Sequence, residues 1–245
     1  MRTLKLTVAY DGTNLAGWQV QPDRRTGQGD LETAWRAVTG EVVRTTASGR
    51  TDAGVHAEGQ VVGLATESKI PDEKLRAALN AHLAEDLVVR RVEPAPAGFH
   101  ATHDALRKTY RYQIHNSRVR PLFDRRFVWQ VPNAPLDAAA MGQGGAALVG
   151  RHDFVCFEST GSERSSTVRT VTACEVTREG ERINLHVTGD GFLYNMVRAI
   201  AGTLVEVGRG ARPPEWVSEV LASRDRAQAG PTAPACGLVL QSVDY

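Results

Sequence analysis

The chain has 245 residues, of which 42% are hydrophobic and 23% charged, with a formal net charge of +1. This composition is typical of a globular protein with a sizeable core, built as one large domain or two modest ones. No segment approaches the roughly 20 apolar residues that a membrane span requires, and the N-terminus shows no signal-peptide pattern.

The first part of the chain predicts strands that alternate with two helices. Apolar residues at every second position predict a strand over 3–10, and Asp11 to Asn14 form a turn. Helical spacing predicts a helix over 31–39 with Asp30 as its N-cap, and a second over 71–83 opened by Pro71. Three further strands are predicted over 42–46, 60–65 and 87–92.

The second part follows a Pro-rich stretch at 93–98, which we take as the boundary. A strand is predicted over 108–115, a Gly- and Ala-rich helix over 137–149, and a hairpin over 168–178 and 182–188. Helices over 192–207 and 213–222 and a final strand over 238–243 complete the chain. Strands that are adjacent in sequence favour an α+β fold with a mainly antiparallel sheet over a parallel βαβ fold. We therefore expect two α+β halves, residues 1–105 and 106–245.

Three cysteines, Cys156, Cys174 and Cys236, are odd in number and far apart. This argues against a disulfide framework and against a zinc site, and it favours a reducing cytoplasm.

The basic residues are mostly arginine, 25 of the 29, which a high-GC genome would also produce. Residues 104–126 include seven basic and two acidic residues, a local balance of +5. The aromatic residues Tyr110, Tyr112 and Phe123 are interleaved with them, and Phe127 follows directly. Guanidinium groups suit phosphates and rings stack on bases, so this segment fits either an RNA surface or an ordinary solvated strand and loop.

The most informative segment is Ala47 to Ala57, in which Asp52 lies among small residues between Gly49 and Gly54. Glycines permit unusual backbone angles and a close approach of a ligand. From the residues alone, Asp52 either closes a turn or is presented to a substrate, because an unpartnered buried carboxylate would be costly.

Ser48 to Ala57, together with Gly59-Gln60-Val61, resembles the signature of the tRNA pseudouridine synthase A family, and the resemblance extends over essentially the whole chain. Further matching motifs occur in the family's order and approximate spacing: 10–14, 17–22, Phe99-His100-Ala101, Tyr110-Arg111-Tyr112, His152-Asp153-Phe154, Arg169-Thr170-Val171, Asn195 to Arg198, and 230–238. The resemblance implies the pseudouridine synthase fold, a mainly antiparallel mixed sheet flanked by helices, with two similar halves meeting at a central cleft.

Residue by residue, the resemblance assigns four roles. Asp52 corresponds to the catalytic nucleophile, and Tyr110 to the tyrosine that packs on the target base. Arg198 corresponds to the basic residue that pairs with the aspartate, and we expect it to keep Asp52 ionised. Arg50 corresponds to an arginine that helps to extrude the target or fills its place.

The implied reaction isomerises uridine to pseudouridine in the anticodon stem-loop of tRNA (positions 38, 39 and 40 in the family) after base flipping. It needs no cofactor and no metal, and the sequence contains no Walker-type loop, dinucleotide fingerprint or cysteine cluster. The implied partners are tRNA and a second copy of the chain in a homodimer, without a membrane or a small-molecule cofactor.

Two alternatives remain at this point. The chain could be an RNA-binding module in which Asp52 only closes a turn, or a hydrolase with Asp52 as glycosidic nucleophile and a second carboxylate from Asp11, Glu58 or Asp104. His100 and His103 could be read as metal ligands, but they lack an acidic or thiol partner at a suitable spacing. The chain departs from the family pattern at Gly27, Ala84, Thr102 and His103, and Thr102 puts one RNA or structural contact in doubt.

Overall fold

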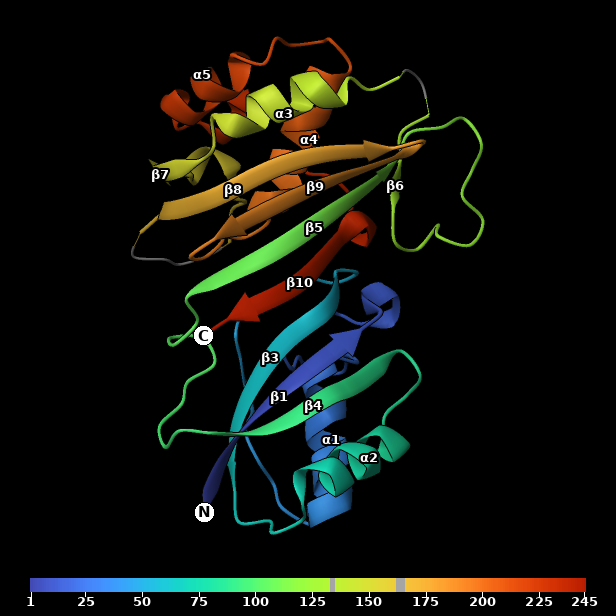
Figure 1. The fold of residues 1–245 in the computed structure, drawn as a ribbon, viewed down its shortest axis with the longest axis vertical. Coiled ribbons are helices and arrows are strands. Elements are labelled where there is room, and N and C mark those ends of the chain that lie inside the picture. Colours follow the sequence, from blue (N-terminus) through green and yellow to red (C-terminus); the bar gives the residue numbers. More distant parts are fainter. Residues whose placement is uncertain (133–134, 162–165) are drawn as a thin grey trace. The chain divides into compact units, whose positions relative to one another are not determined.

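The computed structural model describes residues 1–132, 135–161 and 166–245. Its residues form two compact units (Figure 1). Unit 1 contains Met1–Leu106 together with Leu240–Tyr245, and unit 2 contains Arg107–Val239. The C-terminal residues thus group with the first unit, whereas the sequence placed them in the second half.

Unit 1 is built on an antiparallel sheet. Strand β1 (Arg2–Tyr10) lies between β3 (His56–Thr66) and β4 (Leu87–Ala95) and is antiparallel to both. The short β2 (Thr46–Ala47) pairs with β3, and β10 (Leu238–Asp244) also lies next to β3, both on the edge of β3 that faces away from β1. In β1 the side chains of Leu4, Leu6, Val8 and Tyr10 are buried, as the alternation predicts.

Two helices, α1 (Gly27–Thr39) and α2 (Asp72–His82), lie side by side on the sheet of unit 1 (Figure 1). Helix α2 begins after Pro71, as expected. Helix α1 begins one turn earlier than predicted, because the N-cap is Thr26 and not Asp30: the Thr26 side chain accepts a hydrogen bond from the Gly29 N–H.

Two strand predictions in unit 1 need correction. Residues 42–45 form no strand, and only Thr46–Ala47 pairs with β3. Strand β4 continues through Pro94 to Ala95, within the Pro-rich stretch that we had taken as the boundary. Pro94 stands opposite Leu4 of β1, and a proline is tolerated in a strand where its missing N–H is not needed.

Unit 2 contains four antiparallel strands in the order β5 (Arg107–His115), β9 (Arg182–Gly189), β8 (Val168–Glu179) and β7 (Gly150–Asp153). Strands β8 and β9 form the predicted hairpin, whose turn includes Gly180 at a φ of +58°. The short β6 (Trp129–Gln130) runs parallel to β5. The sheets are therefore mixed but mainly antiparallel, and the predicted α+β fold class is confirmed.

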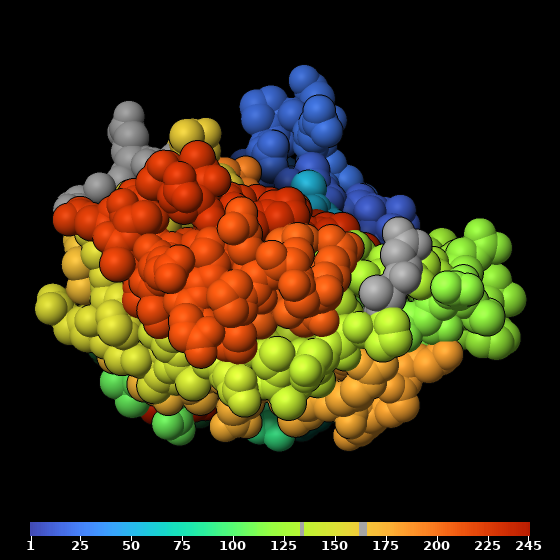
Figure 2. Space-filling view, turned by 90° about the horizontal axis from the view of Figure 1, so that it is seen from above, coloured from blue at the N-terminus to red at the C-terminus, as the bar shows by residue number. Residues whose placement is uncertain are grey.

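Three helices cover one face of the unit 2 sheet: α3 (Ala138–Ala146), α4 (Met196–Gly208) and α5 (Trp216–Ser223) (Figures 1 and 2). The glycines of α3 allow close packing, since a Cβ on Gly144 would come within 2.9 Å of Val217 in α5 and 3.3 Å of Leu204 in α4. Single turns of 3-10 helix occur at Gly12–Asn14 in unit 1 and at Val155–Phe157, Arg226–Gln228 and Ala235–Gly237 in unit 2.

Helix α4 begins four residues later than the pattern predicted. Asn195 adopts left-handed backbone angles with a φ of +60°, so the regular helix starts only at Met196. This irregular entry positions the first turn of α4, which contains Arg198.

Candidate active site

The Asp52 loop connects β2 to β3 in unit 1. The main-chain carbonyl of Asp52 accepts a hydrogen bond from the Val55 N–H at 3.1 Å, which closes a tight turn. Gly54 lies in this turn with a φ of +79°, an angle that residues with side chains rarely adopt. The side chain of Asp52 is half-buried, while that of Arg50 is exposed. The turn thus uses the backbone of Asp52, and the loop presents its carboxylate at an intermediate depth.

One wall of this loop is formed by two glycines of the 11–18 segment. A Cβ on Gly12 would lie 2.0 Å from the carbonyl oxygen of Val55, and a Cβ on Gly17 would lie 2.7 Å from that of Thr51. The Trp18 N–H also donates a hydrogen bond to the Thr51 carbonyl at 3.0 Å. Only glycine permits such a close approach of two backbones. The tight packing fixes the residues immediately before and after Asp52.

A second set of contacts comes from polar side chains buried in the sheet. The hydroxyl of Tyr10 lies 2.7 Å from that of Thr51, the residue before Asp52. Gln60 of β3 donates to the Gly49 carbonyl at 2.9 Å and accepts from the Ser48 hydroxyl at 2.6 Å. Gln60 and Ser48 have no exposed surface. Buried polar groups that satisfy one another specify a single geometry, so this network orients the loop.

His56 and Asp11 anchor the far end of the loop. Nδ1 of His56 accepts a hydrogen bond from the Gly12 N–H at 3.0 Å, and an Asp11 oxygen lies 3.1 Å from the same nitrogen. A neutral ring with its proton on Nε2 accepts from Gly12, whereas a ring with a proton on Nδ1 donates to Asp11. Asp11 also accepts hydrogen bonds from the N–H and hydroxyl of Thr13. This carboxylate thus caps a turn.

The other carboxylates considered as a second acid can also be located. Asp104 accepts a hydrogen bond from the His100 N–H at 2.8 Å and so caps the 100–104 turn. The backbone carbonyl of Glu58 accepts from Arg90 at 2.9 Å. Thr102, a departure from the family pattern, donates its hydroxyl to the Ala47 carbonyl at 2.6 Å and ties this turn to β2.

The two histidines of the same turn stack on each other, with ring centroids 4.1 Å apart. Nδ1 of His100 lies 3.3 Å from both the Thr102 and the His103 amide nitrogens and accepts their hydrogen bonds, a structural use of the ring. Within the described ranges no group of three or more His, Cys, Asp or Glu residues could hold a metal ion. In the same ranges, no helix is both long and apolar enough to cross a membrane.

In unit 2, Arg198 lies in the first turn of α4. Its Nε donates to the Ala233 carbonyl at 2.7 Å, and its Nη1 donates to Oδ1 of Asn195 at 2.7 Å. A cation at a helix N-terminus is unfavourable by itself, because the helix dipole is positive there. These two acceptors hold the guanidinium group despite that, and the side chain is half-buried.

The segment 230–237 contacts α4 closely enough to exclude side chains. A Cβ on Gly202 of α4 would lie 1.7 Å from the Pro231 carbonyl oxygen, and a Cβ on Gly230 would lie 2.7 Å from Cα of Thr203. The Thr203 hydroxyl accepts a hydrogen bond from the Gly230 N–H. This packing positions the Ala233 carbonyl that binds Arg198.

Tyr110 lies on β5, opposite Val187 of β9, and is 8% exposed. The rings of Tyr110 and Phe192 meet nearly at right angles, with centroids 5.1 Å apart and an interplanar angle of 85°. Its neighbour Tyr112 is fully buried and donates its hydroxyl to the Pro234 carbonyl at 2.7 Å. The structure therefore locates Asp52 and Arg50 on one loop of unit 1, and Tyr110 and Arg198 on two elements of unit 2.

A family model described as tRNA pseudouridine synthase matches residues 6–104 and 146–245. The chain belongs to the tRNA pseudouridine synthase A family. Relatives described as tRNA pseudouridine synthase A occur in Brevibacillus brevis, with 48% identity over 245 residues, and in Moorella thermoacetica, with 48% identity over 248 residues. A third, from Pelobacter propionicus, is 45% identical over 245 residues. Each alignment covers 100% of both chains.

Membership of the tRNA pseudouridine synthase A family confirms the resemblance found in the sequence. The chain is an isomerase that converts uridine to pseudouridine in tRNA. This decides against the RNA-binding module without catalysis and against the hydrolase.

Several residues that hold the site in place lie in the sequence motifs, but the sequence assigned them no role. Tyr10, Gln60 and Asn195 lie inside recognised motifs, but only the structure shows which groups they contact. Phe192 lies outside those motifs, and sequence spacing gave no sign of its contact with Tyr110.

Proposed function

We propose that this isomerase acts on uridines of the anticodon stem-loop of tRNA and that Asp52 is its nucleophile. The main support is the loop around Asp52: two glycines that tolerate no side chain and a buried network of Tyr10, Thr51 and Gln60 fix a half-buried carboxylate. A reacting group is effective when its surroundings hold it in place.

The chemistry requires only groups that this chain supplies. The bond between the sugar C1′ and N1 of uracil breaks, the base turns, and C1′ bonds to C5. C5 then loses its proton and N1 gains one, so the product is an isomer of the substrate. Nothing is oxidised and no external group enters, so the reaction balances without a cofactor or a metal. The target base lies in a stacked helix, and we propose that it is flipped out, with the cost of unstacking offset by contacts to the protein.

The remaining roles follow the family pattern. Tyr110 packs on the flipped base, Arg198 pairs with Asp52, and Arg50 helps to extrude the nucleotide or fills its place. Residues 1–105 carry the nucleophile and residues 106–245 carry Tyr110 and Arg198. We further propose that the enzyme is a homodimer and acts in the cytoplasm. Sedimentation of the purified protein tests the homodimer.

The test of Asp52 is to map pseudouridine in transcribed tRNA after treatment with wild type and with Asp52→Asn. We expect pseudouridine in the anticodon stem-loop with the wild type and a loss of at least about a thousandfold in single-turnover rate with the variant, because removing a nucleophile abolishes its step. Asp104→Asn, which changes a turn-capping carboxylate of the same unit, serves as the control. An active Asp52→Asn enzyme would exclude Asp52 as nucleophile, and modification elsewhere in the tRNA would exclude the proposed target.

Tyr110 is tested by Tyr110→Phe. The ring that stacks on the base is retained, and stacking contributes about 1–3 kcal/mol per base in comparable sites. We expect unchanged tRNA affinity and slower turnover if the hydroxyl takes part in removal of the C5 proton. Equal single-turnover rates for both proteins would remove the hydroxyl from the mechanism.

A further inference from the structure

A loop of unit 2 exposes apolar and basic side chains together. Residues 117–127, here called the arm, connect β5 to β6 and project beyond the helices (Figures 1 and 2). Phe123 is 89% exposed, Val119 73% and Leu122 56%. Single exposed apolar residues are ordinary, but three within five positions form a patch that is typical of an interaction site.

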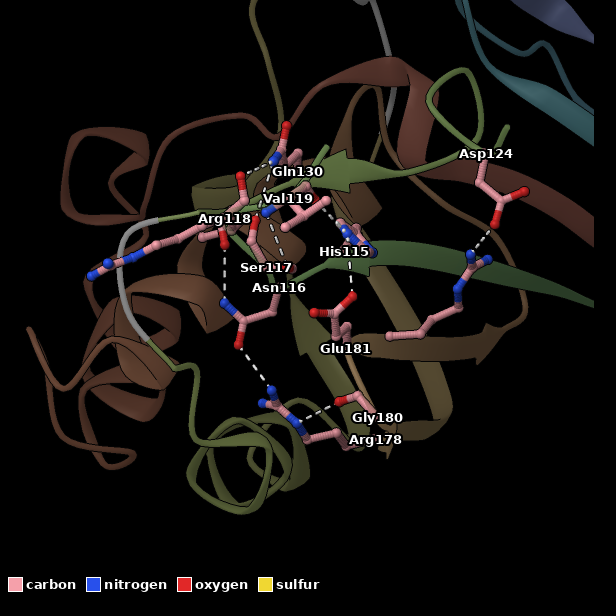
Figure 3. Close-up of polar contacts among 12 residues, drawn as sticks. His115, Asn116, Ser117, Arg118, Val119, Asp124, Gln130, Arg178, Gly180 and Glu181 are labelled. Atoms are coloured by element: carbon pink, nitrogen blue, oxygen red, sulfur yellow. Dashed lines mark hydrogen bonds and ion pairs between the residues drawn. The ribbon is translucent and has the colours of Figure 1, made fainter. Parts of the chain in front are cut away.

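The base of the arm is held by the amide of Asn116 (Figure 3). Its Nδ2 donates to the Val131 carbonyl at 3.0 Å, and its Oδ1 accepts from the Leu136 N–H at 2.8 Å and from Arg178 at 3.0 Å. Arg178 also donates to the Leu136 carbonyl at 2.7 Å. Asn116 is 8% exposed, so these bonds are shielded from water.

Further contacts join the arm to the strands beside it. Gln130 donates a hydrogen bond to the Ser117 carbonyl at 3.1 Å, and Gln113 donates one to the Phe127 carbonyl at 3.0 Å. Nε2 of His115 lies 3.0 Å from the Val119 carbonyl oxygen. Arg182 forms an ion pair with Asp124. The arm is thus a braced structure that presents Phe123 outward. Because the arm is already held in place, little conformational entropy is lost when it binds a partner.

The charge of the arm is strongly positive. It contains Arg118, Arg120, Arg125 and Arg126, and its one acidic residue, Asp124, is neutralised by Arg182. Arg118 and Arg120 are exposed, and the Arg118 side chain points away from the base of the arm (Figure 3).

From these features we infer that the arm is a binding surface for the tRNA substrate: its arginines contact phosphates and Phe123 stacks on an accessible base or ribose. Basic charge beside a stackable ring matches RNA. The excess of positive charge favours a polyanion as the partner, and two arms placed against each other would repel. The inference rests on tRNA as the substrate of the proposed function, but not on the role of Asp52.

A photoreactive aromatic residue in place of Phe123 identifies the occupant directly. With tRNA present and under irradiation, we expect a covalent adduct with RNA, and none when the photoreactive residue replaces Val42, which is 82% exposed in unit 1. An adduct only with a second protein chain would assign the arm to a protein interface and overturn the inference. A yield no higher than that of the Val42 control would overturn it as well.

Affinity gives the quantitative test. In wild type and in the Asp52→Asn background, we expect Phe123→Leu to weaken tRNA binding about five- to a hundredfold and Phe123→Trp to retain it, because stacking needs an aromatic ring. Equal affinities of Phe123→Leu and wild type would contradict stacking, whereas a failure confined to Asp52 would leave these differences intact.

The charge of the arm is tested by Arg118→Gln combined with Arg120→Gln. Each lost phosphate contact should reduce the slope of log affinity against log salt by about 0.7–0.9. The control is Lys69→Gln combined with Lys74→Gln, which removes two exposed charges from unit 1. An identical slope for both double variants would overturn the phosphate contacts.

Discussion

The hydroxyl groups of Tyr10 and Thr51 lie 2.7 Å apart, and their hydrogen bond joins the end of β1 to the residue directly before Asp52. Both side chains are buried, and burial raises the pKa of Tyr10 to about 12. The phenol therefore stays neutral at physiological pH. Gln60 donates a longer bond of 3.4 Å to the same hydroxyl. Because both hydroxyl groups are buried and hydrogen-bonded, they fix the position of the backbone next to Asp52.

Thr51→Val removes this bond with almost no change in shape. We expect it to lower the free energy of unfolding by about 1–3 kcal/mol, because the Tyr10 hydroxyl loses a partner, and to slow single-turnover modification at saturating enzyme. Thr66→Val is the matched control, since Thr66 lies at the other end of β3 and its hydroxyl bonds to Glu41. If both variants lose similar stability and only Thr51→Val is slower, Thr51 positions the backbone next to Asp52. Equal rates for the two variants would contradict that role.

Gly17→Ala tests the close approach behind the loop. Gly17 and Gly40 both have positive φ angles, +96° and +76°, so alanine costs backbone strain of about 1–2 kcal/mol at either position. A Cβ on Gly17 would lie 2.7 Å from the Thr51 carbonyl oxygen, whereas Gly40 has nothing within 4 Å. We expect both variants to be less stable in urea unfolding and only Gly17→Ala to lose activity. Full activity of Gly17→Ala would show that the Asp52 loop can shift to accommodate a Cβ at residue 17 without loss of catalysis.

Asp86→Asn tests how acid affects unit 1. Asp86 accepts two hydrogen bonds from Arg25, at 2.6 and 2.7 Å, and these lower the pKa of its carboxyl group. A depressed pKa stabilises the fold above the unfolded value near 3.9, and that stabilisation is lost as pH falls through the folded value. We expect Asp86→Asn to be less stable than wild type at pH 7 and the difference to shrink below about pH 4.

Urea unfolding over a pH series measures this difference. Glu73→Gln is the control, because the Glu73 side chain, which pairs with Arg76, is 80% exposed. Such surface ion pairs contribute at most about 1 kcal/mol to the free energy of unfolding. A stability difference for Asp86→Asn that is the same at every pH would contradict the assignment.

Arg198→Lys separates charge from geometry in α4. Lysine retains the positive charge but lacks the planar group that donates to Ala233 and Asn195 in different directions. We expect the single-turnover rate to fall by about a hundredfold for Arg198→Lys and further for Arg198→Met, with unfolding monitored to exclude a general loss of structure. Wild-type turnover with lysine would show that charge alone is sufficient, and wild-type turnover with methionine would remove Arg198 from the mechanism.

The sequence predicted the elements whose pattern is local. The alternation in β1 and the paired runs of β8 and β9 were found almost to the residue. The starts of two helices were missed: α1 begins at Gly27 because Thr26 caps it, and α4 begins late because Asn195 adopts left-handed backbone angles. Motif order identified the family and the loop of Asp52, but the contacts that hold the loop involve residues far apart in sequence, as with Tyr10 and Thr51.

Strand β10 has a consequence for how this protein is made. Leu240–Tyr245 belong to unit 1, where a Cβ on Gly59 would lie 2.5 Å from the Gln241 carbonyl oxygen. During synthesis from the N-terminus, residues 1–106 leave the ribosome long before this strand exists, so the part of the β3 edge that pairs with β10 has no partner while unit 2 is translated. Closing so long a loop is slow. Unit 1 can therefore reach its final form only after residues 240–245 have emerged from the ribosome.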